Sequence, residues 1–124
     1  MEKEIKFRGF LNGNIYPLHC VYANGNVEYI GFDQKVKLAL VDEVKIMQYI
    51  GLKDKNGVEI YGKDIIEDYG GYVDFCQDCF SYQIFHNFDK EPYCYSCNGD
   101  FTLQESKEDF IVIGNLYQNP YLLY

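Results

Sequence analysis

Hydrophobic and polar residues alternate over short stretches of the chain, and Asn/Gly-rich turns separate these stretches. A period of two is typical of half-buried β-strands, and Asn-Gly favours tight hairpin turns because both residues tolerate a positive φ. Turns are expected at residues 12–14, 23–26 and 54–57. Strands are expected at Ile5–Phe10, Ile15–Tyr22, Val27–Phe32, Lys45–Gly51, Val58–Tyr61, Asp64–Ile66 and Phe110–Gly114.

The segment Lys35–Val41 fits either a helical turn or a strand. No helix-period pattern reaches the roughly twelve residues at which a helix can be told from a buried strand. The sequence therefore predicts a mostly-β fold, a small barrel or a sandwich.

The length of 124 residues suits one domain, or one domain with a small appendage, and 48% hydrophobic residues argue against intrinsic disorder. The start at Met1–Glu4 lacks the basic and apolar regions of a secretory signal. No apolar run approaches the roughly 18 residues of a membrane span. We expect a soluble protein that works in the cytoplasm and not at a membrane.

Four of the five cysteines form two Cys-x2-Cys pairs. Cys76 and Cys79 make the first pair, and Cys94 and Cys97 follow after fourteen intervening residues. Two such knuckles joined by a hairpin favour a tetrahedral structural Zn²⁺ site. Iron takes the same ligands in a rubredoxin-like site, and disulfides would need an oxidising compartment, of which the sequence gives no sign. Metal binding would fold the segment 70–101.

The formal net charge is −8, and all of it lies in the second half of the chain. Residues 1–62 hold eight basic and eight acidic side chains, whereas residues 63–124 hold three basic and eleven acidic ones. With Arg8 as its single arginine, the chain is poorly suited to bind nucleic acid directly. The acidic half is suited to a basic protein, such as one that itself binds nucleic acid; the charge could equally serve solubility alone.

The knuckle segment is dense in aromatic residues interleaved with acidic ones. A zinc ribbon has little interior, so we expect some of these rings to anchor a protein interface; packing on the β core of the same chain is the alternative. The candidate contacts are Tyr82, Phe85, Asp89, Glu91, Tyr93 and Tyr95.

The sequence offers little that indicates catalysis. His19 and Cys20 are adjacent on an expected strand, so their side chains point to opposite faces and form no ready nucleophile–base pair. Cys20 is expected to be a buried small hydrophobic residue. No phosphate-binding glycine motif is present, and four thiolates leave no open position on a metal. We expect a protein that is not an enzyme.

Three segments resemble the YopX-like family of small phage and prophage proteins. They are Glu4-Ile-Lys-Phe-Arg-Gly-Phe10, Ile46-Met-Gln-Tyr-Ile-Gly-Leu-Lys-Asp-Lys-Asn-Gly-Val-Glu-Ile-Tyr-Gly-Lys-Asp-Ile-Ile66 and Val112-Ile-Gly-Asn-Leu-Tyr-Gln-Asn-Pro-Tyr-Leu-Leu123. The chain departs from the family where Gly62-Lys63 stands in place of Glu-Gly, and in the knuckle segment, which the family pattern does not include.

The resemblance implies an SH3-like β-barrel, a phage or prophage origin and a tendency to self-associate. We expect a core made of residues 1–69 and 102–124, with 70–101 as a zinc-ribbon-like insertion. The resemblance brings no catalytic residues.

These observations support three hypotheses. The first is a phage accessory protein that binds and inhibits a basic host protein, such as a CRISPR nuclease, in the bacterial cytoplasm. The second is a zinc-ribbon nucleic-acid-binding module, for which Lys53, Lys55 and Lys63 could supply a local basic cluster. The third is a structural or assembly oligomer of the phage. We favour the first, in the manner of an anti-CRISPR inhibitor.

Overall fold

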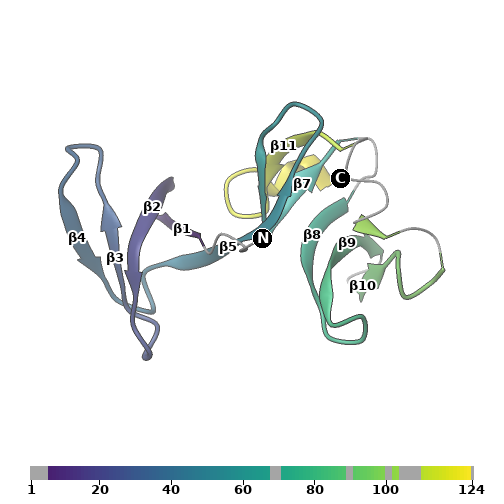
Figure 1. Cartoon of the computed structure of the whole chain (residues 1–124), viewed down its shortest axis with the longest axis horizontal. Helices are drawn as coiled ribbons and strands as arrows, with labels where there is room; N and C mark the ends of the chain where they lie inside the picture. The colour runs from purple at the N-terminus through teal and green to yellow at the C-terminus, as the bar shows by residue number, and fades with distance from the viewer. Residues whose placement is uncertain (1–5, 68–70, 89–90, 100–101, 104–109, 124) are drawn as a thin grey trace. The chain divides into compact units, whose positions relative to one another are not determined.

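The computed structural model describes residues 6–67, 71–88, 91–99, 102–103 and 110–123 (Figure 1). The chain divides into two compact units, Met1–Tyr49 and Ile50–Tyr124. The boundary falls inside a single strand, β5 (Lys45–Lys53), so each unit contains part of it.

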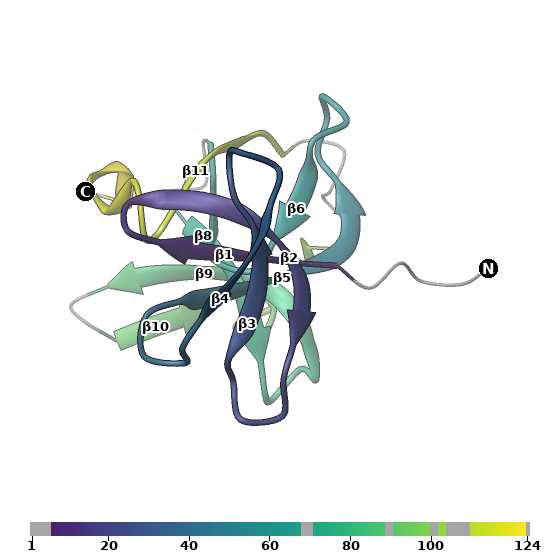
Figure 2. The same cartoon turned by 90° about the vertical axis from the view of Figure 1, so that its left-hand side faces the viewer.

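The first unit is a run of antiparallel strands built from the Asn/Gly turns. In the six-stranded sheet β4-β3-β2-β1-β5-β6, its strands follow one another as hairpins (Figure 2). They are β1 (Phe7–Leu11), β2 (Asn14–Val21), β3 (Val27–Ile30) and β4 (Val36–Ala39). The turn between β1 and β2 has Asn12 at φ 51° and Gly13 at φ 84°, the paired positive angles of a two-residue hairpin. The ambiguous segment Lys35–Val41 therefore contains a strand.

The core of this unit is small. Its buried side chains are Leu11, Val27, Ala39 and Val44, and partly buried residues on β2, β3 and β5 pack against them. Val27 and Ala39 are direct partners across β3 and β4, which places both on the core face.

The second unit contains a five-stranded antiparallel sheet in the order β10-β9-β8-β7-β11. Its strands are β7 (Asp64–Ile66), β8 (Gly71–Cys76), β9 (Ser81–Phe88), β10 (Glu91–Cys94) and β11 (Val112–Asn115). The short β6 (Glu59–Tyr61) belongs to the same sheet as β5, and a 3-10 helix, η2 (Pro120–Leu123), follows β11. The buried core consists of Ile50, Ile60, Ile66, Val73, Ile84, Leu103 and Phe110.

A buried carboxylate ties the central turn to the last strand. Asp54 Oδ1 accepts the backbone N–H groups of Asn56 and Val58, which closes the turn after β5. Its other oxygen accepts the N–H of Val112, a residue 58 positions further along the chain. This one side chain therefore joins two of the three segments that carry the family resemblance.

A second polar node organises the end of β11. The buried Asn115 accepts the N–H groups of Tyr117 and Gln118 through Oδ1, while its own N–H donates to Asn119 Oδ1. A Cβ added to Gly114 would lie 2.5 Å from that same Asn119 oxygen, so only glycine fits there. The Gly-Asn and Asn-Pro elements of the C-terminal segment are thus parts of one turn.

The mostly-β class is confirmed. The expected barrel is corrected: within the described residues both sheets are open, because each has two edge strands. Segment 70–101 supplies β8, β9 and β10, which share a sheet with β7 and β11. Its separation as a domain from residues 1–69 and 102–124 stays a prediction.

Candidate metal centre

The strand order brings the two Cys-x2-Cys pairs to one place. Cys76 is the last residue of β8, and Cys94 is the last residue of β10. Both strands run antiparallel to β9, which lies between them. Cys76 is opposite Ser81, the first residue of β9, whereas Cys94 is opposite Phe85, in the middle of β9. Each Cys-x2-Cys knuckle follows directly from the strand that supplies its first cysteine.

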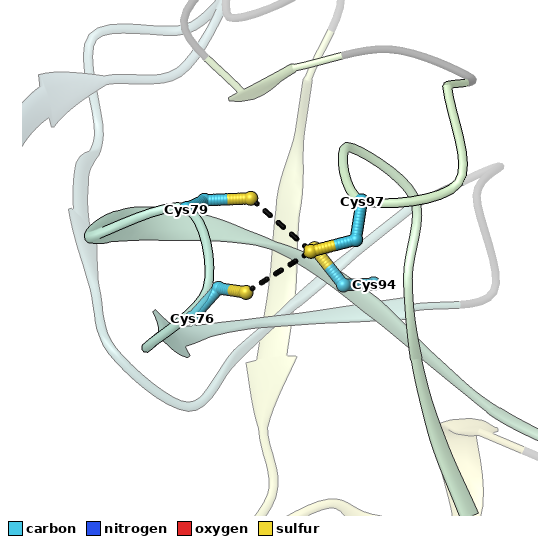
Figure 3. Close-up of side chains that lie close together, drawn as sticks. All are labelled: Cys76, Cys79, Cys94 and Cys97. Atoms are coloured by element: carbon cyan, nitrogen blue, oxygen red, sulfur yellow. Dashed lines mark hydrogen bonds between the residues drawn. The ribbon is translucent and has the colours of Figure 1, made fainter.

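The four sulfur atoms converge (Figure 3). All lie within 4.8 Å of one another, and Cys97 Sγ lies 3.4 Å from Cys76 Sγ and 3.3 Å from Cys79 Sγ. A tetrahedral Zn²⁺ with bonds of about 2.3 Å holds its sulfurs roughly 3.8 Å apart, so the donor set fits such an ion. Cys76 and Cys94 are buried, whereas Cys97 is exposed. The predicted ligands Cys76, Cys79, Cys94 and Cys97 therefore form one cluster, whose donor atoms fit a metal ion.

The acidities of the thiols show why this cluster suits a cation. Burial acts to raise the pKa of Cys76, but hydrogen bonds from the backbone N–H of Cys79 and from neighbouring thiols outweigh it and lower that pKa. Hydrogen bonding to Cys79 and then to Cys76 raises the pKa of Cys97, and burial raises that of Cys94. A negative charge on Cys76 thus opposes ionisation of Cys94 and Cys97, and a divalent ion would hold four thiolates together.

The donor set is of the kind that suits a structural metal ion. Four thiolates are soft ligands that suit zinc or iron, and a closed four-coordinate site has no position for substrate or water. Cys76, Cys79, Cys94 and Cys97 would hold the ion, which would supply a cross-link between β8 and β10. That the metal is zinc stays a prediction.

The knuckles are anchored on the core of the second unit. Asn98 Nδ2 donates to the backbone oxygen of Cys94 at 2.7 Å, which fixes the second knuckle. The buried Gln83 accepts the N–H of Leu103 and donates to Ser81 Oγ, connecting β9 to a core residue. Sequence reasoning missed Gln83, because nothing in the pattern marks it as buried.

The aromatic candidates for partner contact are half-buried. Tyr82 and Tyr95 pack against the core cluster, and the ring of Phe85 stacks on Tyr72 with centroids 5.9 Å apart. Tyr93 meets Tyr95 edge-on at 5.6 Å. Asp89 lies outside the described residues, and Glu91 is described only by its place in β10. Among the described side chains of the segment, the most exposed aromatic residue is one that sequence reasoning did not select, Phe80.

Cys20 takes no part in this cluster. It lies on β2 in the first unit, and it is half-buried where the sequence suggested full burial. Its register partner across the sheet is Glu28, which places it on the face opposite the core residue Val27.

The fold and the site together define a mostly-β protein in which two Cys-x2-Cys knuckles bring four cysteine sulfurs together in an arrangement that fits a metal ion. The chain belongs to the YopX family, whose model, described as YopX protein, matches residues 13–124. The match confirms the resemblance and indicates a phage-type protein; it includes the second and third quoted segments and the knuckles, and begins after Phe10. No curated protein matches the sequence. Among the described residues, no helix has the length and apolar character needed to cross a membrane.

Proposed function

We propose that this chain is a non-enzymatic phage accessory protein that binds and inhibits a basic host protein, with zinc as a structural ion. The favoured target is a nucleic-acid-handling defence enzyme, and the mode is that of an anti-CRISPR inhibitor of a CRISPR nuclease. The observation that carries the proposal is that all the excess negative charge belongs to the unit that bears the four-cysteine cluster.

The two units differ sharply in charge. Met1–Tyr49 contains six basic and six acidic residues, whereas Ile50–Tyr124 contains five basic and thirteen acidic ones. One of the five, Lys63, already forms an ion pair with Asp74 at 2.5 Å. Four thiolates on a divalent ion would add a formal charge of −2. Such a unit repels phosphate and complements the positively charged channel that a CRISPR nuclease uses to hold its guide and target.

The closed cysteine cluster supports a role without catalysis. A metal held by four protein ligands performs no hydrolysis, because no site remains for an activated water molecule. The metal would contribute rigidity, since it would hold the acidic segment 70–101 in one conformation before the partner protein binds. A preorganised surface loses less entropy on association.

The test is binding to a purified CRISPR nuclease loaded with its guide, immobilised and exposed to the zinc-loaded full chain over a range of salt. We expect binding that weakens as salt rises, because the attraction is electrostatic. The double variant Asp89→Asn/Glu91→Gln should bind more weakly. The matched control Glu2→Gln/Glu4→Gln removes the same charge from the first unit and should bind like wild type.

Two results would overturn the proposal. Equal binding by wild type and the Asp89→Asn/Glu91→Gln variant would remove the role of the acidic segment. Binding to a bare single-stranded oligonucleotide, with no binding to the nuclease, would identify a nucleic-acid-binding module instead.

A further inference from the structure

One face of the β8–β9 hairpin carries an apolar row that runs out of the core to the knuckle tip. It begins at Val73 and Ile84, which are register partners and 0% and 1% exposed. The next pair on the same face is Phe75 and Tyr82, whose rings meet edge-on at 5.5 Å. Because side chains two positions apart share a face of the sheet, this row continues the core surface beyond the point where the core ends.

The row ends in exposed aromatic side chains. Phe75 is 46% exposed, and Phe80, directly after Cys79 in the first knuckle, is 84% exposed. Phe80 also adopts φ 53°, a left-handed conformation that a bulky residue rarely takes. Glycine or asparagine would fit this turn with less strain. Neither burial nor backbone geometry in the folded chain therefore accounts for an aromatic residue at position 80.

The turn that carries Phe80 also carries an acidic side chain. Asp78 is exposed in the same turn, and Phe80 directly follows Cys79, a member of the four-cysteine cluster. An exposed ring with a negative rim complements an apolar pocket bordered by Lys or Arg side chains, since interface anchors combine a buried aromatic centre with charged edges.

We propose that Phe80, supported by Phe75, is the anchor with which the second unit docks into an apolar pocket rimmed by basic side chains on a partner protein. The basic character of that partner rests on the proposed function. The inference places the contact at the knuckle tip, where Phe80 and Phe75 are exposed.

The probe is a synthetic amphipathic peptide of leucine and lysine, titrated into the zinc-loaded full chain and followed by NMR chemical shifts. We expect shifts centred on Phe75 and residues 78–82, and no binding of a leucine/glutamate peptide with the same pattern. Phe80→Asn tolerates the left-handed turn, so it should fold and still bind metal while losing about 30-fold in peptide affinity. The control Phe32→Ala truncates a ring that is 74% exposed in the first unit and should change affinity less than about twofold.

Three results would overturn the docking surface. They are full peptide affinity in Phe80→Asn, shifts centred elsewhere than the knuckle tip, and nuclease binding that is unchanged in Phe80→Asn. Measuring nuclease binding in parallel separates this inference from the proposed function. Peptide binding at the tip without nuclease binding would leave the docking surface intact and remove the nuclease. Nuclease binding that is unchanged in Phe80→Asn would do the reverse.

Discussion

Replacing Asp54 with alanine should destabilise the second unit, because its buried carboxylate is the acceptor for backbone groups of two distant segments. Its carboxylate accepts three backbone N–H groups, from Asn56 at 2.8 Å, from Val58 at 2.9 Å and from Val112 at 2.9 Å. Asp54 itself is only 7% exposed. Alanine at this position leaves all three donors without the acceptor that the fold provides.

The magnitude follows from how well water can replace each bond. The N–H of Val112 lies at a partly buried strand, so its loss should cost about 1–3 kcal/mol. Asn56 and Val58 lie in an exposed turn, where water is a ready substitute and each loss should cost about 0.5–1.5 kcal/mol. The total of about 2–6 kcal/mol is a large part of the roughly 5–15 kcal/mol that stabilises a typical domain.

The assay is urea unfolding of the zinc-loaded chain, with hydrogen exchange at β11 to assign the loss to the second unit. Asp54→Asn keeps only one acceptor oxygen in place of two, so its free energy of unfolding should fall by about half as much as that of Asp54→Ala. Asp33→Ala is the matched control, because Asp33 also accepts a turn N–H, from Lys35, but is exposed to solvent. Equal unfolding midpoints for Asp54→Ala and Asp33→Ala would refute the reasoning.

Three further predictions concern the metal, a strained turn and alkaline pH. Cys97→Ser should release the metal and lose much of the roughly 10–16 kcal/mol that zinc binding supplies. Metal content and melting temperature would measure the loss, and the control Cys20→Ser should change neither. Equal effects of the two substitutions would mean that the ligand set is wrong. Lys63 has a positive φ of 76°, which glycine adopts without strain and alanine does not. The free energy of unfolding of Lys63→Gly should therefore exceed that of Lys63→Ala by about 1 kcal/mol, measured by urea unfolding. A more stable Lys63→Ala would contradict backbone strain at this position. Burial, with Asp74 nearby, raises the pKa of Tyr72 above the ordinary tyrosine value of 10.0. The stability that the neutral phenol contributes is complete below pH 10 and is lost as pH rises through the higher pKa of the folded state. Tyr72→Phe should therefore reduce the fall in melting temperature above pH 10. An unchanged fall would exclude Tyr72 as its source.

The sequence predicts local features of this fold well. The Cys-x2-Cys spacing identifies the metal cluster because each knuckle is a local turn that sets its own two sulfurs side by side. Asn12-Gly13 predicts a hairpin for the same reason, since the two residues alone meet the φ requirement of the turn. The strand expected at Asp64–Ile66 is present, although all three of its residues are buried and none alternates to solvent.

Features that depend on distant residues could not be read in this way. The bond from Val112 to Asp54 joins residues 58 positions apart, and no local pattern pairs them. The boundary between the units falls inside β5, where the sequence has no linker composition. Aromatic content marked the knuckle segment as a surface, but only the structure separates Tyr82, which packs against the core cluster, from Phe80, which is exposed in the turn before β9.

The most direct test of the central claim is DNA cleavage by a guide-loaded CRISPR nuclease in the presence of increasing amounts of the zinc-loaded chain. We expect cleavage to stop at about one chain per nuclease and to resume when Cys97→Ser replaces wild type, because the acidic segment 70–101 then loses its metal cross-link. Cleavage that continues at full rate with saturating, metal-replete wild-type chain would contradict the claim.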